Sequence, residues 1–159
     1  MKSKIVELSE LAEISATLRR EGRRLVATNG CFDLLHLGHV RYLRAARALG
    51  DALVVGVNGD SSVRELKGAG RPLNPDFARA EVLAALECVD YVAVFPEVRA
   101  SRFLEHARPA IYVKGGDYKP STLNQEERAV LEQITAEIRI IPFAPGYSTS
   151  SLIERGGIR

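Results

Sequence analysis

Short runs of β-branched and apolar residues alternate with helical patterns, and this alternation constrains the fold more than any other feature of the chain. The predicted strands run from Leu25 to Thr28, Leu53 to Val57, Tyr91 to Phe95, Ile111 to Lys114 and Ile138 to Pro142. The predicted helices between them run from Val40 to Leu49, Phe77 to Leu86 and Arg102 to Ala107. Such alternation is typical of a parallel sheet with helices on both faces. We therefore predict a Rossmann-like, doubly wound α/β fold with a five-stranded parallel sheet.

An additional helix is predicted before the first strand, over about 8–21. Apolar residues recur at helical spacing from Leu8 to Leu18, with a candidate cap at Ser9 and with Gly22 placed to end the helix. We expect this helix to contribute packing rather than chemistry.

Composition predicts a single domain over 1–159 and excludes several classes of protein. The chain has 159 residues and two cysteines, Cys31 and Cys88, which are too few for a disulfide framework. No signal peptide or long apolar run is present, so we expect a cytoplasmic protein without membrane contact. The net charge is only +2 and its charges are interspersed, which argues against nucleic acid as a partner.

Polar and glycine-rich clusters follow four of the predicted strands, where parallel sheets bind their ligands. They begin at Asn29, Asn58, Gly115 and Gly146. The first cluster opens the run Gly-Cys-Phe-Asp-Leu-Leu-His-Leu-Gly-His, residues 30–39. A glycine turn before a helix directs peptide N–H groups toward an anion, and two histidines three residues apart can reach the same anion. This run therefore predicts a phosphate site.

Alternative chemistries for these residues are weaker. Cys31, Asp33, His36 and His39 could in principle hold a metal, but their spacing fits no usual zinc pattern. Ser148 lacks the second glycine of a nucleophile elbow. It could cap the last helix or bind phosphate there, and both interpretations stay open.

Two further loops carry charges that could serve ligands. Lys67 and Arg71 flank a glycine-rich segment that we expect to be a mobile loop over the strand ends. There it would bind a second anionic substrate or the polyphosphate, and an ordinary surface loop is the alternative. Lys114 ends a buried strand, a costly place for a charge without a partner. Asp117 follows it and could contact a ligand hydroxyl, unless the segment is a simple turn.

These motifs resemble a known family. His36-Leu37-Gly38-His39 matches the H-x-G-H motif of a nucleotidyltransferase superfamily. The segments N-G-C-F-D at 29–33, R-P-L-N-P at 71–75 and V-K-G-G-D-Y at 113–118 are more specific. Together they resemble the cytidylyltransferase-like adenylyltransferase domains of ADP-heptose synthases, which act on D-glycero-β-D-manno-heptose 1-phosphate. The resemblance covers nearly the whole chain.

The resemblance implies transfer of AMP from ATP to a sugar 1-phosphate with release of pyrophosphate. It also implies Mg²⁺ bound through the ATP phosphates rather than by side chains. A homodimer is the oligomeric state that the resemblance implies. His36, His39 and Lys67 would be catalytic. The expected nucleotide site comprises Asn29, Gly30, Cys31, Phe32, Asp33, His36, Gly38, His39, Gly115, Gly116, Asp117, Gly146, Tyr147, Ser148 and Thr149. The expected sugar phosphate site comprises Asn58, Asp60, Lys67, Arg71 and Lys114.

Other functions stay open at this stage. Glycerol-phosphate cytidylyltransferases carry R-T-E-G-I-S-T-T where this chain has F-A-P-G-Y-S-T-S at 143–150, which argues against CTP. A cytidylyltransferase for a phosphorylated polyol or amino alcohol and a non-catalytic nucleotide-binding module are the alternatives. No sugar kinase segment accompanies the motifs, so we expect a stand-alone adenylyltransferase. Phosphates should raise the pKa of the two histidines, while roles for Ser150 and for the segment from Lys119 to Glu132 are not predicted.

Overall fold

The sheet of this protein has five strands, all parallel, in the order β3-β2-β1-β4-β5. A computed structural model describes residues 2–116, 119–142 and 145–157. The strands are β1 (Leu25–Gly30), β2 (Ala52–Asn58), β3 (Tyr91–Phe95), β4 (Ile111–Gly115) and β5 (Glu137–Ile141). Each lies within two residues of its predicted bounds, and the predicted doubly wound fold is confirmed.

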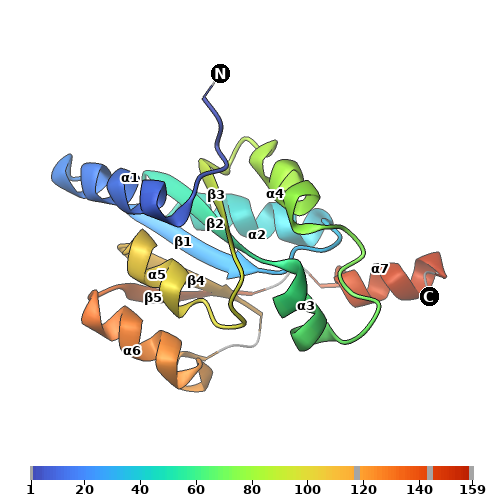
Figure 1. The fold of residues 1–159 in the computed structure, drawn as a ribbon. Coiled ribbons are helices and arrows are strands. Elements are labelled where there is room, and N and C mark those ends of the chain that lie inside the picture. The colour runs from blue at the N-terminus through green and yellow to red at the C-terminus, as the bar shows by residue number, and fades with distance from the viewer. Residues whose placement is uncertain (1, 117–118, 143–144, 158–159) are drawn as a thin grey trace.

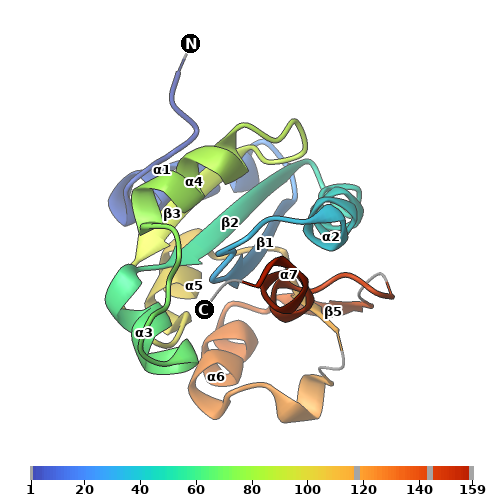
Figure 2. The ribbon, with the colours of Figure 1, turned by 90° about the vertical axis from the view of Figure 1, so that its right-hand side faces the viewer.

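Helices cover both faces of the sheet (Figure 1). One face carries α1 (Leu8–Arg20), α5 (Ser101–Ala107) and α6 (Gln125–Gln133), and the other carries α2 (Leu37–Arg47) and α4 (Asp76–Ala84). Two helices, α3 (Asp60–Lys67) and α7 (Thr149–Gly156), lie beyond the carboxyl ends of the strands, with a short 3₁₀ turn η1 (Pro120–Thr122) before α6. Figure 2 looks onto this edge, where the strand order reverses at β1. None of the described helices is long and apolar enough to cross a membrane.

Some local predictions need correction. The first helix begins at Leu8 with Glu7 as its N-cap residue, not Ser9, although Gly22 follows its end with a φ of 70° as predicted. Helices α3 and α6 were not predicted. Both are short and mostly polar, and the only buried apolar side chains are Val63 in α3 and Val130 and Leu131 in α6. A helical period cannot be recognised from so few apolar positions.

Strand β2 crosses the middle of the core, and all seven of its residues are buried. Its Gly56 faces the ring of Phe103 in α5, because a Cβ added there would lie 2.9 Å from two ring carbons. The absence of a side chain at Gly56 therefore allows α5 to pack closely on the sheet.

We predict that Gly56→Ala lowers the free energy of unfolding by about 1–3 kcal/mol, since overpacking forces a side chain or the backbone to shift. Urea unfolding measures the change. The double variant with Phe103→Leu should recover part of the loss, because the smaller side chain makes room for the methyl group. Additive effects of the two substitutions would contradict this contact.

Candidate functional site

A cavity of about 690 Å³ opens at the carboxyl ends of the strands. Its wall is formed by the β1–α2 turn, the region after α3, the β3–α5 loop, the end of β4 and the starts of α6 and α7. This is the edge at which parallel α/β sheets bind ligands. The predicted location of the site therefore coincides with a cavity of ligand size.

The turn after β1 owes its shape to a strained residue. Phe32 has a φ of 48°, which is rare for a bulky side chain. Its buried ring lies against Gly30, where an added Cβ would be 3.1 Å from a ring carbon, and 5.3 Å from the ring of His39. The absence of a side chain at Gly30 thus leaves room for the ring of Phe32, and Phe32 itself adopts the left-handed backbone conformation of this turn.

The two histidines lie together at the start of α2. His36 is the N-cap residue and His39 lies in the first turn, with their ring centroids 3.9 Å apart. A Cβ at Gly38 would be 2.8 Å from Cε1 of His36, so the glycine leaves room for that ring. Both Nδ1 atoms are buried and have no hydrogen-bond partner among the residues that the structure describes. A bound anion would supply acceptors for these nitrogens.

The protein alone, without a bound phosphate, favours the neutral form of both histidines. Burial, together with the smaller effect of neighbouring His36, lowers the pKa of His39 to about 4. Burial also lowers the pKa of His36. The protein alone therefore holds His39 neutral near pH 7, and only the binding of an anion can drive its protonation.

Asp33 secures the loop that follows α3. Its carboxylate, 1% exposed, accepts hydrogen bonds from Arg71 Nε (2.7 Å) and from the amides of Leu73 (2.8 Å) and Asn74 (2.9 Å). Burial alone would raise the pKa of Asp33, but these donors hold it below its usual value. The end of the loop, from Arg71 to Asn74, is therefore anchored to Asp33, and the charge of Arg71 is paired with that of Asp33.

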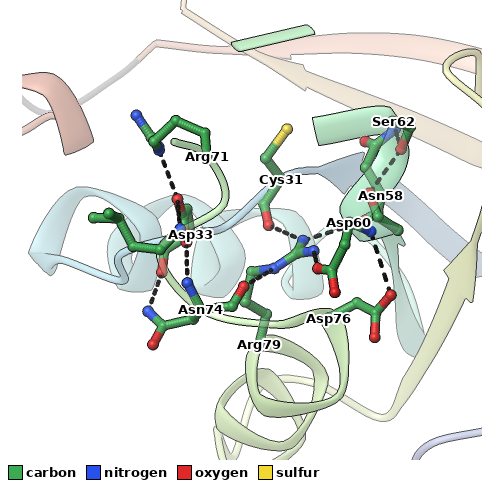
Figure 3. A network of polar contacts seen from close by, with 11 residues as sticks. Cys31, Asp33, Asn58, Asp60, Ser62, Arg71, Asn74, Asp76 and Arg79 are labelled. Carbon is green, nitrogen blue, oxygen red and sulfur yellow. Dashed lines mark hydrogen bonds and ion pairs between the residues drawn. The ribbon is translucent and has the colours of Figure 1, made fainter. Parts of the chain in front are cut away.

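Arg79 of α4 is the residue that the sequence analysis missed (Figure 3). Its side chain is 1% exposed and donates to the carbonyl oxygens of Cys31 (2.7 Å), Asn58 (2.7 Å) and Asn74 (2.9 Å). It also donates to the carboxylate of Asp60 at 2.9 Å. This one guanidinium joins the β1–α2 turn, the end of β2, the loop after α3 and α3 itself. In the sequence it resembles any helical arginine, so no local pattern could have revealed it.

The remaining predicted residues divide into two groups. The cavity is lined by Asn29, Gly30, Cys31, Phe32, Asp33, His39, Asn58, Lys67, Arg71, Lys114, Gly115 and Thr149, and also by Ser150. His36, Gly38, Asp60, Gly116, Gly146, Tyr147 and Ser148 are not among its lining residues, and Asp117 lies outside the described residues.

Several of these side chains also have structural partners. Asp60 is bound to Arg79, and the Asn58 amide donates to Ser62 and to the β3–α5 loop. Ser148 caps α7 by accepting from the Ser151 amide, which confirms the capping interpretation. Thr149 donates to the Leu34 carbonyl and so ties α7 to the β1–α2 turn.

Comparison with known proteins identifies the family of the chain. The family model named cytidylyltransferase-like matches residues 27–155. The chain belongs to the cytidylyltransferase-like family. Curated relatives include the bifunctional protein HldE of Nitratiruptor, 49% identical over 95% of this chain, and that of Methylococcus capsulatus, 52% identical over 94%. This chain spans 31% of the length of each of these two relatives.

Two solved structures place this cytidylyltransferase-like chain among known folds. The lipopolysaccharide core biosynthesis protein from Thermoplasma volcanium is 27% identical, with a TM-score of 0.64 over 77% of this chain and 98% of that chain. The pantoate-beta-alanine ligase from Francisella tularensis has a TM-score of 0.61 over 94% of this chain and 69% of that chain. At 13% identity, the ligase supports the fold alone.

We predict that Arg79→Met lowers the free energy of unfolding by about 3 kcal/mol, because three carbonyl oxygens lose their donor and Asp60 loses its partner. Chemical denaturation measures this loss. Arg64→Met, at an exposed position of α3, is the matched control and should change the free energy of unfolding by no more than about 0.5 kcal/mol. Equal effects of the two substitutions would contradict the role of Arg79.

The lowered pKa of His39 predicts a pH dependence of stability. Between about pH 6.5 and pH 4 the unfolded chain binds a proton at His39 that the native state does not, so the stability contributed by the neutral ring falls as pH falls through this window. His39→Asn should remove this component, on the order of 1 kcal/mol by pH 5. Urea titrations of the wild type and of His39→Asn at pH 7, 6 and 5 test this prediction. An equal loss of unfolding free energy in the two proteins as pH falls would contradict it.

Proposed function

We propose that this chain transfers the adenylyl group of ATP to D-glycero-β-D-manno-heptose 1-phosphate and releases pyrophosphate. The observation that carries the proposal is the pair of adjacent histidines at the start of α2, with both Nδ1 atoms buried and unpartnered, in a cytidylyltransferase-like chain. The more specific motifs at 29–33, 71–75 and 113–118 support ATP and a heptose phosphate as the substrates.

The site suits a triphosphate on physical grounds. The positive end of the α2 dipole and its free N–H groups lie at His36, and Lys67 adds a charge on the cavity wall. Neutral imidazoles donate hydrogen bonds to phosphate oxygens, and the added negative charge favours their protonation. Binding of ATP near pH 6 would therefore be coupled to proton uptake at the histidine pair.

The reaction needs no general base. An oxygen of the sugar phosphate, already an anion, attacks the α-phosphorus of ATP in line with the bond to the β-phosphate. The new P–O bond forms while that bond breaks, and pyrophosphate leaves with the electron pair. His36, His39 and Lys67 would stabilise the charge that develops on the phosphate oxygens.

Magnesium would enter as part of the nucleotide substrate. Among the described residues, Asp33 and Glu127 are the carboxylates that line the cavity, and both accept hydrogen bonds from the protein. The described residues include no group of three or more His, Cys, Asp and Glu side chains that could hold a metal. This donor set fits Mg²⁺ held by phosphate oxygens and water, where it neutralises charge on the leaving group.

A pyrophosphate-release assay with ATP or CTP and the heptose 1-phosphate tests the proposed function. ATP with the heptose phosphate should be the preferred pair. Preference for CTP with a phosphorylated polyol would instead support the cytidylyltransferase alternative, and nucleotide binding without any release of pyrophosphate would support a non-catalytic module.

In the same assay, His39→Asn should lower kcat about a hundredfold, the usual cost of losing one donor to a transition-state oxygen. His106→Asn is the matched control, because His106 lies on α5 and is not among the cavity-lining residues. It should retain wild-type turnover. Near-normal kcat in the His39 variant would overturn the assignment of the histidines.

A further inference from the structure

A reaction between two anionic substrates requires cationic groups at two places in the site. For the second substrate, the structure points to cationic residues that differ in part from those expected from the sequence. The cationic side chains that line the cavity are Lys67, Arg71, Arg99 and Lys114. Arg71 is bonded to Asp33 and is 20% exposed, so much of its charge is already neutralised. Arg99, which no sequence motif singled out, is an additional candidate.

Arg99 lies on a loop whose backbone is fixed from two sides. The Asn58 amide, at the end of β2, donates to the carbonyl oxygens of Glu97 (3.3 Å) and Val98 (3.4 Å). On the other side, Glu127 of α6, itself 6% exposed, accepts from the Ala100 amide at 2.8 Å. These contacts hold the residues before and after Arg99, so the position of its Cα at the cavity is set by one buried and two part-buried hydrogen bonds.

The guanidinium of Arg99 has no carboxylate partner within 4.0 Å among the residues that the structure describes. Its side chain is exposed and lines the cavity together with half-buried Lys114. Burial lowers the pKa of Lys114 while nearby Glu127 acts in the opposite direction. A bound phosphate beside both cations would favour the charged lysine and supply an acceptor for the arginine.

Arg99 and the two histidines come from opposite faces of the sheet. His36 and His39 begin α2, whose apolar side packs on one face of the sheet, whereas Arg99 precedes α5 on the opposite face. The cavity is lined by residues from both sides across the carboxyl ends of the strands. Figure 2 shows α2 on one side of the sheet and α5 and α6 on the other. A triphosphate on the α2 side therefore leaves the α5–α6 side for the other substrate.

We infer that Arg99 and Lys114 bind the phosphate of the sugar 1-phosphate, and that the start of α6 forms the wall against its hydroxyl groups. This inference rests on the proposed function and specifies its acceptor subsite. Thr122, Asn124 and Glu127 supply the polar atoms of that wall. The segment from Lys119 to Glu132, whose role the sequence left open, thus becomes part of substrate recognition.

Steady-state kinetics of Arg99→Gln test the inference. The KM for heptose 1-phosphate should rise roughly ten- to a hundredfold, the range for losing one hydrogen bond to a charged group, while the KM for ATP changes less than about twofold. Arg99→Lys should recover part of the loss because it restores the charge. Arg102→Gln is the matched control, since Arg102 pairs with Glu97 outside the cavity, and should behave as wild type. An unchanged KM for the sugar phosphate, or equal increases for both substrates, would overturn the inference.

Calorimetric binding separates this inference from the proposed reaction. Heptose 1-phosphate and the same heptose without phosphate are titrated into wild type and Arg99→Gln, with thermal unfolding to confirm that both fold. If wild type binds the phosphate ester but releases no pyrophosphate, weaker binding by the variant supports the subsite while the proposed reaction fails. If wild type is active and the variant binds equally well, the subsite fails and the reaction stands. If wild type neither binds nor turns over the ester, both are overturned.

Discussion

The buried guanidinium of Arg79 is the interaction on which the rest of the site depends. It donates to carbonyl oxygens from three separate segments and to the carboxylate of Asp60, and its side chain is almost fully excluded from solvent. Arginine suits this position because its planar fork keeps five donors in fixed directions without changing its charge. One side chain from α4 thereby fixes the β1–α2 turn relative to α3 and the loop that follows it.

Polar groups at the carboxyl edge fall into three groups. Asp33 with Arg71, and Asp60 with Arg79, form ion pairs that shape loops and leave little net charge for a ligand. Lys67 and Arg99, in contrast, are exposed side chains on the cavity wall. The histidines form a third group, because burial keeps His39 neutral until an anion approaches. The site thus combines a rigid, internally neutralised frame with a few cations available to ligands.

The cavity has a separate part of one edge for each of the two proposed substrates. Helix α2 brings its N-terminus and the histidine pair from one side, and the β3–α5 loop with α6 forms the other side. The hydrogen bond between Glu127 and Ala100 joins α6 to that loop. The proposed acceptor subsite is therefore built by tertiary contacts between segments that are 27 residues apart in sequence.

Much of the fold was predictable, because strand and helix periods are local properties of the sequence. The strands of β-branched residues, the proximity of His36 to His39 and the cap at Ser148 all depend on residues a few positions apart. Short polar helices such as α3 and α6 escaped prediction because they expose most of their residues and carry a weak apolar signal.

The sequence by itself determined the sheet, the edge at which the cavity opens and the pairing of two histidines after the β1–α2 turn. Only the tertiary structure decided the tasks of the individual charges. Asp33 and Asp60 resembled ligand-binding carboxylates in the sequence, yet the fold brings each against an arginine at least 19 residues away. The physical reason is that the energy of a charge depends on its burial and on its partners, and both are set by segments that meet only after folding.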